Sequence, residues 1–538
     1  QIYFEHAQLR FFGIPILYLP RVRLPDPTLD RARGFLIPEF KNNTRLGFGV
    51  KTPYFIPLGK HKDLTLAPYL TSKTTTVELR YRQATRNGGF EFEGAVSRDD
   101  LLPGETRGYL FGSGAFDLAR DYKLTFDVQA VTDLTYFDDY RYSDKDRLRS
   151  RIEVSRVRRN KNVELRLSAY HSLRPADINS QLPNIVVEGV MERRVPLSSK
   201  LGEFGYQVSF LGSRRSSDTN IVGLDVARLS AQANWFGTYT IASGIILDGY
   251  AEAGVDGYFV RQDTNFPDPV FNSTVTASAT LRWPWMRKGA GGGVSVIEPI
   301  FQLVHTEGTG DPIPNQDSTR VDFDFGNMFA SNRAPGHDLT EFGTRLNVGL
   351  RGHHSMTNGS ELAWSFGRVF RGSNPNVFST SSGLAGTHSD WLIEAGYKSA
   401  NGLEILNRNI IANTGGVRKS ETRVALDSER NTIAATHTWL EADVAEARPI
   451  AVSELSFTGS RAVTDNWTVS TGLRYDFRTE TLTEAELGAQ YENECIDVNF
   501  SASRRFTGVA STDFGLKVSL RGFGTGAVDE KKTHKCGG

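Results

Sequence analysis

A run of seven residues decides the fold: Leu229-Ser230-Ala231-Gln232-Ala233-Asn234-Trp235. Apolar side chains occupy every second position of this run, and polar side chains occupy the positions between them. A period of two is typical of a β-strand with one apolar and one polar face. Similar segments follow one another along most of the chain, for example at 124–130, 163–169 and 467–475. They are roughly 10 residues or longer, about twice the usual length of a soluble strand and close to what a tilted strand needs to cross a bilayer.

Ionisable residues recur on the polar face of these segments. They are Asp127, Glu164, Arg166, Arg345, Glu361, Glu404, Arg423 and Arg474. Closing such strands into a barrel removes both free edges and gives all the polar faces one wet interior. A soluble solenoid, a propeller or a chain of sandwiches would also hold amphipathic strands, but no fixed-period repeat supports them. We therefore predict an all-β fold, a large antiparallel transmembrane β-barrel.

The composition agrees with this class and excludes others. The chain of 538 residues has 62 basic and 62 acidic residues, 52 Gly and only 2 Cys. Net neutrality gives no field for binding nucleic acid, so no nucleic-acid partner is expected. Two cysteines are too few for a disulfide-built scaffold. No stretch has the roughly 20 apolar residues that a spanning helix needs.

The number of strands follows from the lengths of the connections. We recognise about 25 strands by periodicity, with long connections at 136–146, 172–183, 261–272, 307–339 and 371–387. Short turns lie at Arg120, Asn160, Asn401-Gly402 and Glu492-Asn493. Outer-membrane barrels keep short turns in the periplasm, and two periplasmic ends require an even number of strands. The parity places a missing strand early, best at 34–41, which gives about 26 strands. Such a barrel is too wide for side chains to fill, so a partner or folded loops such as 307–339 must plug it.

Several segments resemble the lipopolysaccharide-assembly family called LptD. They are Gly34-Phe35-Leu36-Ile37-Pro38, Leu46-Gly47-Phe48-Gly49-Val50-Lys51-Thr52-Pro53-Tyr54-Phe55 and Asp63-Leu64-Thr65-Leu66-Ala67-Pro68-Tyr69, with Gly13-Ile14-Pro15 to Tyr18-Leu19-Pro20 at the start, Glu298-Pro299-Ile300 in the middle and Cys495 near the end. The similarity runs over the whole chain but is specific mainly in residues 11–70. It implies a 26-stranded barrel that receives lipopolysaccharide from a periplasmic bridge and inserts it into the outer leaflet.

The resemblance also implies a domain plan and partners. Residues 1–33 would be the end of a truncated periplasmic β-jelly roll and a linker, 34–525 the transmembrane barrel, and 526–538 a periplasmic tail. Both termini would face the periplasm of a Gram-negative cell. The implied partners are lipopolysaccharide, membrane lipids, a lipoprotein plug in the lumen (LptE-like) and a periplasmic bridge protein (LptA-like) that binds the jelly roll. No cofactor is expected.

Two prolines near the start suggest a weak place in the barrel wall. Pro53 and Pro68 fall in the first predicted membrane strands, where proline cannot donate to a strand ladder. The resemblance implies a lateral gate here, formed by Pro53, Tyr54, Phe55 and Pro68, at a seam joining a strand in about 44–56 to one in about 511–523. The alternative interpretation is that both prolines merely end strands at loops.

The two cysteines are candidates for disulfide bonds, since both are expected in the oxidising periplasm. The resemblance implies disulfides to the missing N-terminal domain, while a bond between Cys495 and Cys536 is also possible. The family pattern has two adjacent barrel cysteines and this chain does not, so the connectivity stays open. Cys536 can also be an incidental free thiol in the tail.

No catalytic or metal-binding constellation emerges. His353-His354 looks like part of a solvated loop, and Asp322 and Asp324 suit a long polar loop as well as they suit a cation. The chain has no Gly-x-Ser-x-Gly elbow, HExxH motif or phosphate loop, so we expect no metal and no enzyme. The rival functions are a barrel for solute uptake, a protein-secretion barrel of the usher kind and a barrel enzyme.

Overall fold

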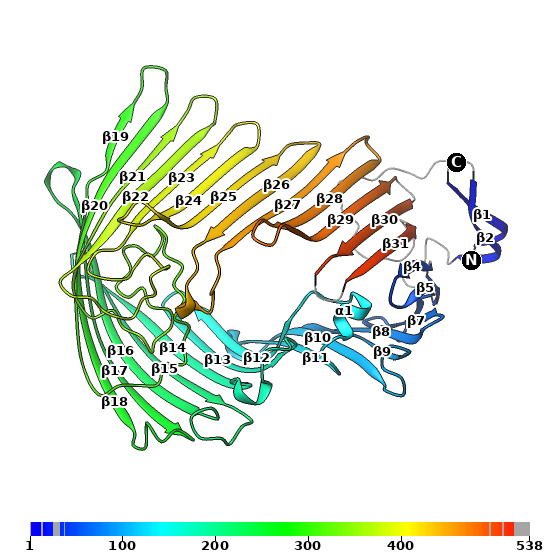
Figure 1. Cartoon of the computed structure of the whole chain (residues 1–538), viewed down its shortest axis with the longest axis horizontal. Coiled ribbons are helices and arrows are strands. Elements are labelled where there is room, and N and C mark those ends of the chain that lie inside the picture. The colour runs from blue at the N-terminus through cyan, green and yellow to red at the C-terminus, as the bar shows by residue number, and fades with distance from the viewer. Residues whose placement is uncertain are drawn as a thin grey trace.

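The computed structural model describes residues 2–11, 14–24, 33–36, 38–198, 200–493, 496–507 and 510–520. It consists of one large closed antiparallel barrel and a separate two-stranded sheet, formed by β1 (Ile2–Phe11) and β2 (Ile14–Leu24), as Figure 1 shows. No helix in these residues is long and apolar enough to cross a membrane. The fold class predicted from the sequence is confirmed.

The barrel strands follow one another in chain order around the wall. Their bounds are β3 Gly34–Phe35, β4 Glu39–Asn43, β5 Gly47–Lys51, β6 Tyr54–Pro57, β7 Lys62–Thr71, β8 Thr74–Thr85, β9 Gly88–Asp99, β10 Arg107–Asp117, β11 Lys123–Val131, β12 Arg147–Arg158, β13 Lys161–Ser172, β14 Ile185–Ser198, β15 Gly202–Arg214, β16 Asp225–Thr240, β17 Ile246–Arg261, β18 Val270–Arg282, β19 Trp285–Lys288, β20 Val294–Thr309, β21 Gly343–Ser355, β22 Glu361–Arg371, β23 Trp391–Lys398, β24 Leu403–Ile411, β25 Val417–Asp427, β26 Asn431–Leu440, β27 Val452–Ala462, β28 Trp467–Asp476, β29 Thr481–Glu492, β30 Ile496–Arg505 and β31 Ser511–Leu520.

Within the described residues, helical structure is confined to the connections. The α-helix α1 spans Tyr136–Tyr140, and the four short 3₁₀ turns are Ala119–Asp121, Asn179–Gln181, Ala242–Gly244 and Val444–Glu446.

Three strands are each broken into two halves. β3 and β4 pair with β6 and β5, β5 and β6 both pair with β7, and β18 and β19 both pair with β20. The segments from β3 to β31 therefore form 26 strands. The strand that periodicity misses lies at β3 and β4, as parity predicts for 34–41. Its two short halves carry too little alternation to be recognised.

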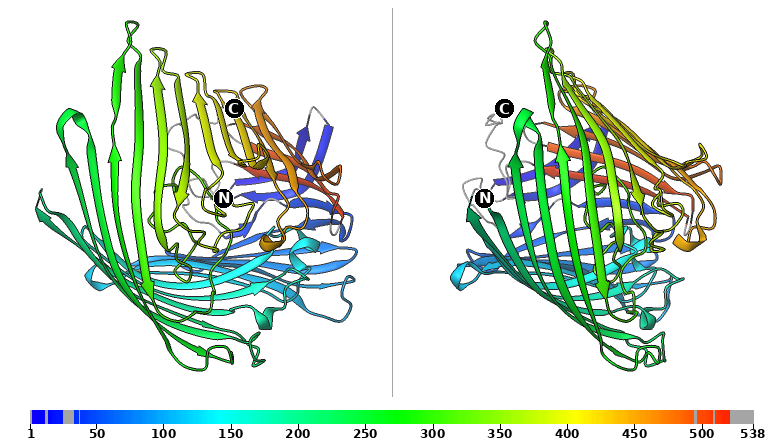
Figure 2. Two further views of the ribbon diagram at one scale, coloured as in Figure 1. Left: turned by 60° about the vertical axis from the view of Figure 1, so that its left-hand side comes forward. Right: turned by 90° about the vertical axis from the view of Figure 1, so that its left-hand side faces the viewer.

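The two rims of the barrel differ, as expected. One rim, called here the long-loop rim, carries the connections 132–146, 262–269, 310–342 and 372–390. The opposite short-turn rim carries brief turns such as Arg159-Asn160 and 399–402. Figure 2 shows the strands inclined between these rims around a wide interior.

Side chains alternate between the two faces of the wall. On β16, Val226, Arg228 and Ser230 are buried, while Ala227 and Leu229 between them are exposed on the outside. The apolar face of the alternating pattern thus points outward, as a barrel in lipid requires. β16 and β17 pair over sixteen residues, from Asp225↔Arg261 to Thr240↔Ile246.

The loop 310–342 folds back into the barrel and fills part of its interior (Figures 1 and 2). Phe323 and Met328 of this loop are fully buried in a cluster with Val369, Leu392 and other wall residues. Arg228 on β16 donates to Asp338 of the loop at 2.7 Å. The loop therefore acts as an internal plug, one of the two possibilities that the barrel width suggests.

A buried carboxylate fixes the end of this plug. The Oε1 atom of Glu341 accepts from Arg333 and from Arg371, each at 2.6 Å, and Arg345 lies 3.8 Å from its Oε2 atom. All four side chains are at most 2% exposed. One carboxylate thus lies among three guanidinium groups, in a place where an unpaired charge is costly.

Candidate functional site

The barrel closes through an unusually short ladder. β31 pairs with β4 over only four residues, from Asp513↔Asn43 to Leu516↔Phe40. Two further bonds join Thr44 and Thr512 at the long-loop rim. Among the described residues the ladder does not extend beyond Leu516, so it covers only the half of β31 nearest that rim. At about 1 kcal/mol per net hydrogen bond, this seam is much weaker than any full ladder of the wall.

The seam does not involve the strand expected from the sequence. The prediction that a strand in 44–56 meets the last strand is wrong, because the short β3 and β4 lie between them and β4 makes the closure. Tyr54 and Phe55 belong to the second strand, where they pair with β3 on one side and β7 on the other.

The two prolines lie one and two ladders away from the seam. Leu36 donates to the carbonyl of Pro53 at 2.8 Å, and Thr52 donates to the carbonyl of Pro68 at 3.0 Å. Neither proline has an N–H to return, so each ladder lacks one bond at this point. Pro68 lies inside β7 and Pro53 lies between the two halves of one strand. The alternative interpretation, that they end strands at loops, is therefore wrong.

Charged side chains line the inner side of the seam. Lys517 on β31 lies 3.6 Å from Glu39 on β4, and this carboxylate also pairs with Lys51 at 2.7 Å. Lys51 in turn lies 3.2 Å from Glu78, which accepts a bond from Tyr142 of loop 132–146 at 2.8 Å. A row of polar groups therefore crosses from the last strand into the lumen.

Apolar side chains cover the outer side of the same strands. Phe35, Phe48 and Phe514 are all exposed, with Phe35 reaching 73%. The rings of Phe35 and Tyr54 meet edge to face at 4.8 Å, and those of Phe40 and Phe48 stack at 6.4 Å. The seam thus separates an apolar exterior from a polar interior.

A cavity of about 810 Å³ lies inside the barrel between the plug and the wall. Asp324 and Phe325 of the plug line one side of it, and Trp364, Arg351 and Glu298 line the other. Glu298 pairs with Arg351 and with Arg282, so its charge is compensated. The cavity is a mixed polar and aromatic space.

The other residues noted in the sequence have ordinary partners. Asp322 and Asp324 bind Arg408 at 3.4 and 3.3 Å, and Asp322 also binds Lys419. Burial alone would raise the pKa of Asp322, but these cations lower it.

The remaining candidates divide between paired and undescribed residues. His354 shares a hydrogen bond with Ser295 at 2.8 Å, and His353 lies 3.9 Å from Glu361. Cys495 and Cys536 fall outside the described residues, so their pairing stays a prediction.

Sequence reasoning missed a second set of residues at the seam. The loop 132–146 contains Tyr136-Phe137-Asp138-Asp139-Tyr140, which forms α1 against the long-loop rim near the seam (Figure 1). This dense aromatic and acidic run was the only signal available. Its partners Arg45 and Arg505 have no local pattern that marks them.

Known proteins resemble the chain over most of its length. Residues 105–460 match the model of the family LptD, described as LPS transport system D. The LPS-assembly protein LptD of Nitrosomonas eutropha is 22% identical over 96% of this chain and 72% of its own length. The protein of the same name from Shewanella oneidensis is 22% identical over 99% of this chain and 70% of its own.

Solved barrels resemble the chain only weakly. The alcaligin receptor FauA of Bordetella pertussis aligns over 91% of this chain and 76% of its own, with 9% identity and a TM-score of 0.31. The hemophore receptor HasR of Serratia marcescens aligns over 91% and 80%, with 10% identity and a TM-score of 0.33.

Proposed function

Because this chain belongs to the LptD family and transports lipopolysaccharide for assembly in the outer membrane, we propose that it releases the lipid sideways through the seam between β4 and β31. The observation that carries the proposal is the four-residue ladder at this seam. The long-loop rim faces the outside of the cell, and the short-turn rim faces the periplasm.

The two sides of the seam match the two parts of the substrate. Lipopolysaccharide has acyl chains, which need an apolar surrounding, and a charged saccharide, which needs water or polar groups. The apolar surrounding outside the seam comes from Phe35, Phe48 and Phe514. The polar row inside the seam begins with Lys517 and Glu39. Through an opening between β4 and β31, the acyl chains can pass along the apolar exterior while the charged saccharide stays among the polar groups of the interior.

The missing hydrogen bonds favour opening at this place. Pro53 and Pro68 weaken the two ladders next to the seam, so the first strands can move as a unit at low cost. Tyr54 and Phe55 belong to that moving unit rather than to the seam itself. In this sense Pro53, Tyr54, Phe55 and Pro68 support the gate from the adjacent strands.

The domain plan and partners complete the proposal. Residues 1–33 form the end of a periplasmic jelly roll, whose open edge suits strand addition by an LptA-like bridge protein. Residues 526–538, which lie outside the described residues, would be a periplasmic tail, with both termini in the periplasm. An LptE-like lipoprotein shares the lumen with the plug loop 310–342. Disulfides of Cys495 and Cys536 would form in the same oxidising compartment.

The test is photo-crosslinking in living cells. A photoreactive phenylalanine analogue replaces Phe35, which lies on the periplasmic half of the first strand. The control is Phe204, which is also exposed on the outside and lies near the short-turn rim, but on the far wall in β15. Both sites face the inner leaflet, where lipopolysaccharide is absent unless it is in transit.

We expect lipopolysaccharide adducts at Phe35 and none at Phe204. Equal labelling at both sites, or at neither, would contradict release through the seam. Capture of a small solute or of a secreted protein at Phe35 would instead favour the uptake or secretion barrel.

A further inference from the structure

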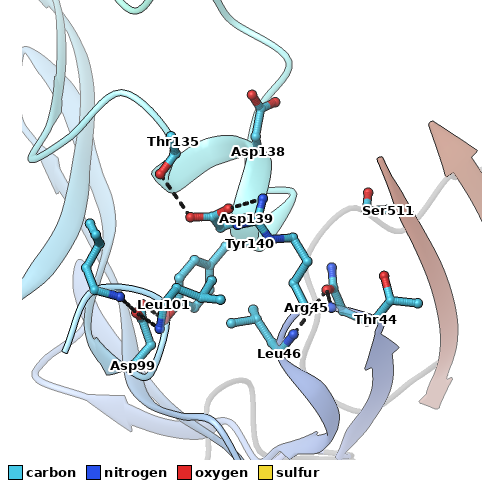
Figure 3. Close-up of polar contacts among 12 residues, drawn as sticks. Thr44, Arg45, Leu46, Asp99, Leu101, Thr135, Asp138, Asp139, Tyr140 and Ser511 are labelled. Atoms are coloured by element: carbon cyan, nitrogen blue, oxygen red, sulfur yellow. Dashed lines mark hydrogen bonds and ion pairs between the residues drawn. The ribbon is translucent and has the colours of Figure 1, made fainter. Parts of the chain in front are cut away.

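One loop bridges the two sides of the seam although it belongs to neither. The loop 132–146 connects β11 to β12, and its helix α1 lies over the ends of β4 and β31 at the long-loop rim (Figure 3). Its contacts reach the first strands, the last strands and the wall between β8 and β10.

The loop binds the turn between β4 and β5 on the first side of the seam. Arg45 of this turn lies 2.8 Å from Asp139. The adjacent Leu46 is 1% exposed and packs against Tyr136, Phe137 and Tyr140 of α1. A charge pair and a buried leucine therefore fasten the first strands to the loop.

The loop binds β30 and β31 on the other side of the seam. Arg141 donates to Asp513 on β31 at 3.0 Å. Arg505 at the end of β30 donates to Asp138 at 2.6 Å and to Asp144 at 3.1 Å. These pairs join residues that lie more than 350 positions apart in the chain, with separations of 372, 367 and 361.

A buried network anchors the loop to the wall. Arg107 on β10, which is 1% exposed, donates to Asp133 and Asp139 at 2.8 Å. Tyr140 donates to Asp99 at 2.8 Å. Burial alone would raise the pKa of Asp133, but Arg107 lowers it, which keeps this anchor ionised at neutral pH. Asp139 is shared between Arg107 and Arg45, so the anchor and the first strands meet at one carboxylate.

We propose that the loop 132–146 is a clasp that holds the seam closed at its outer end, and that the seam parts there only when Arg45, Arg141 and Arg505 leave their carboxylate partners. The proposal rests on the function proposed above and adds an element that regulates the opening of the seam. The clasp contributes three polar attachments and one apolar attachment across a seam whose own ladder has four residue pairs. The loop therefore decides how readily the outer end opens.

Amide hydrogen exchange of the full chain in lipid nanodiscs tests the clasp. The variant carries Arg45→Gln and Arg505→Gln, which remove one attachment on each side of the seam. The control is Arg147→Gln, which breaks the pair between Arg147 and Asp177 at 3.1 Å on the same rim without touching the seam.

We expect about tenfold faster exchange in residues 39–43 and 511–518 of the double variant. Exchange in β16 and β17 should not change in the double variant. Exchange at the seam should not change in Arg147→Gln. Unchanged exchange at the seam would overturn the proposal. Equal acceleration in β16 and β17 would overturn it too, because the loop would then stabilise the whole barrel.

Swapping the two charges of one ion pair distinguishes loss of that pair from general destabilisation of the barrel. Arg505→Asp alone should speed exchange at the seam, and adding Asp138→Arg should restore slow exchange. Failure of the second change to restore it would show that the pair does not act as a link. These readouts need no lipopolysaccharide, so the clasp and the release route at Phe35 can fail independently.

Discussion

The amide nitrogen of Thr52 donates to the carbonyl of Pro68 at 3.0 Å, and Trp283 donates to the carbonyl of Pro299 at 3.2 Å in the same way on the far wall. In both places the donor precedes a second proline, Pro53 or Pro284, at which its strand is broken in two. The wall thus repeats one weakened arrangement beside the seam and again in β18 to β20. The arrangement on the far wall therefore serves as a control for the role of the arrangement beside the seam.

Replacing Pro68 by valine should slow the release of lipopolysaccharide. The substitution restores an N–H to the ladder and should stabilise it by about 1 kcal/mol. The measurement is the rate at which newly made lipopolysaccharide reaches the cell surface after a pulse label. Pro299→Val is the matched control and should leave that rate unchanged. Equal slowing by both substitutions would mean that barrel stiffness in general, and not the seam, limits release.

Replacing Glu341 by glutamine should free the plug. The change leaves Arg333, Arg345 and Arg371 without their shared carboxylate, and loss of one partner from a buried charge cluster costs about 3 to 5 kcal/mol. Ion conductance of the barrel in planar bilayers should rise. Glu361→Gln, a half-exposed carboxylate on the same strand as Arg371, should leave conductance as it is. A closed pore in Glu341→Gln would show that the apolar cluster around Phe323 suffices to hold the loop.

Acidification should release the plug by the same route. Burial alone would raise the pKa of Glu341, but Arg333, Arg371 and Arg345 lower it below 4.5. A carboxylate whose pKa is lower in the folded protein gives stability that is complete above its ordinary pKa and is lost as the pH falls through the folded value. Conductance should therefore stay low near neutral pH and rise below about pH 4.5.

The variant checks this assignment of the acid transition. Glu341→Gln should begin with high conductance and show a smaller acid-dependent rise than the unmodified chain. Asp322 of the same loop has a pKa that its cationic partners also lower, so some acid dependence should remain. An identical pH profile in the two proteins would place the transition in another group.

The sequence alone predicts those parts of the structure that depend on periodicity. The outward apolar face and the even strand number follow from alternation along strands such as β16 and from connection lengths. The need for a plug follows from the barrel width, but the sequence leaves open whether a loop or a partner supplies it. The seam partner does not, because β4 has only five residues and nothing local distinguishes it from a linker. The pairing of Arg45 with Asp139 is equally hidden, since closure of the barrel brings these distant residues together.

The short ladder at the seam also has a consequence for how the protein folds. Asn43 and Asp513 are hydrogen-bonded across a separation of 470 residues, whereas the longest connection between other neighbouring strands is the loop 310–342. Contacts with the largest loop-closure entropy form late, so this junction is the natural last step of folding. Opening it in the mature protein retraces that last step. A barrel that releases its cargo here would pass through a state like its last folding intermediate, in which only the seam between β4 and β31 is unpaired.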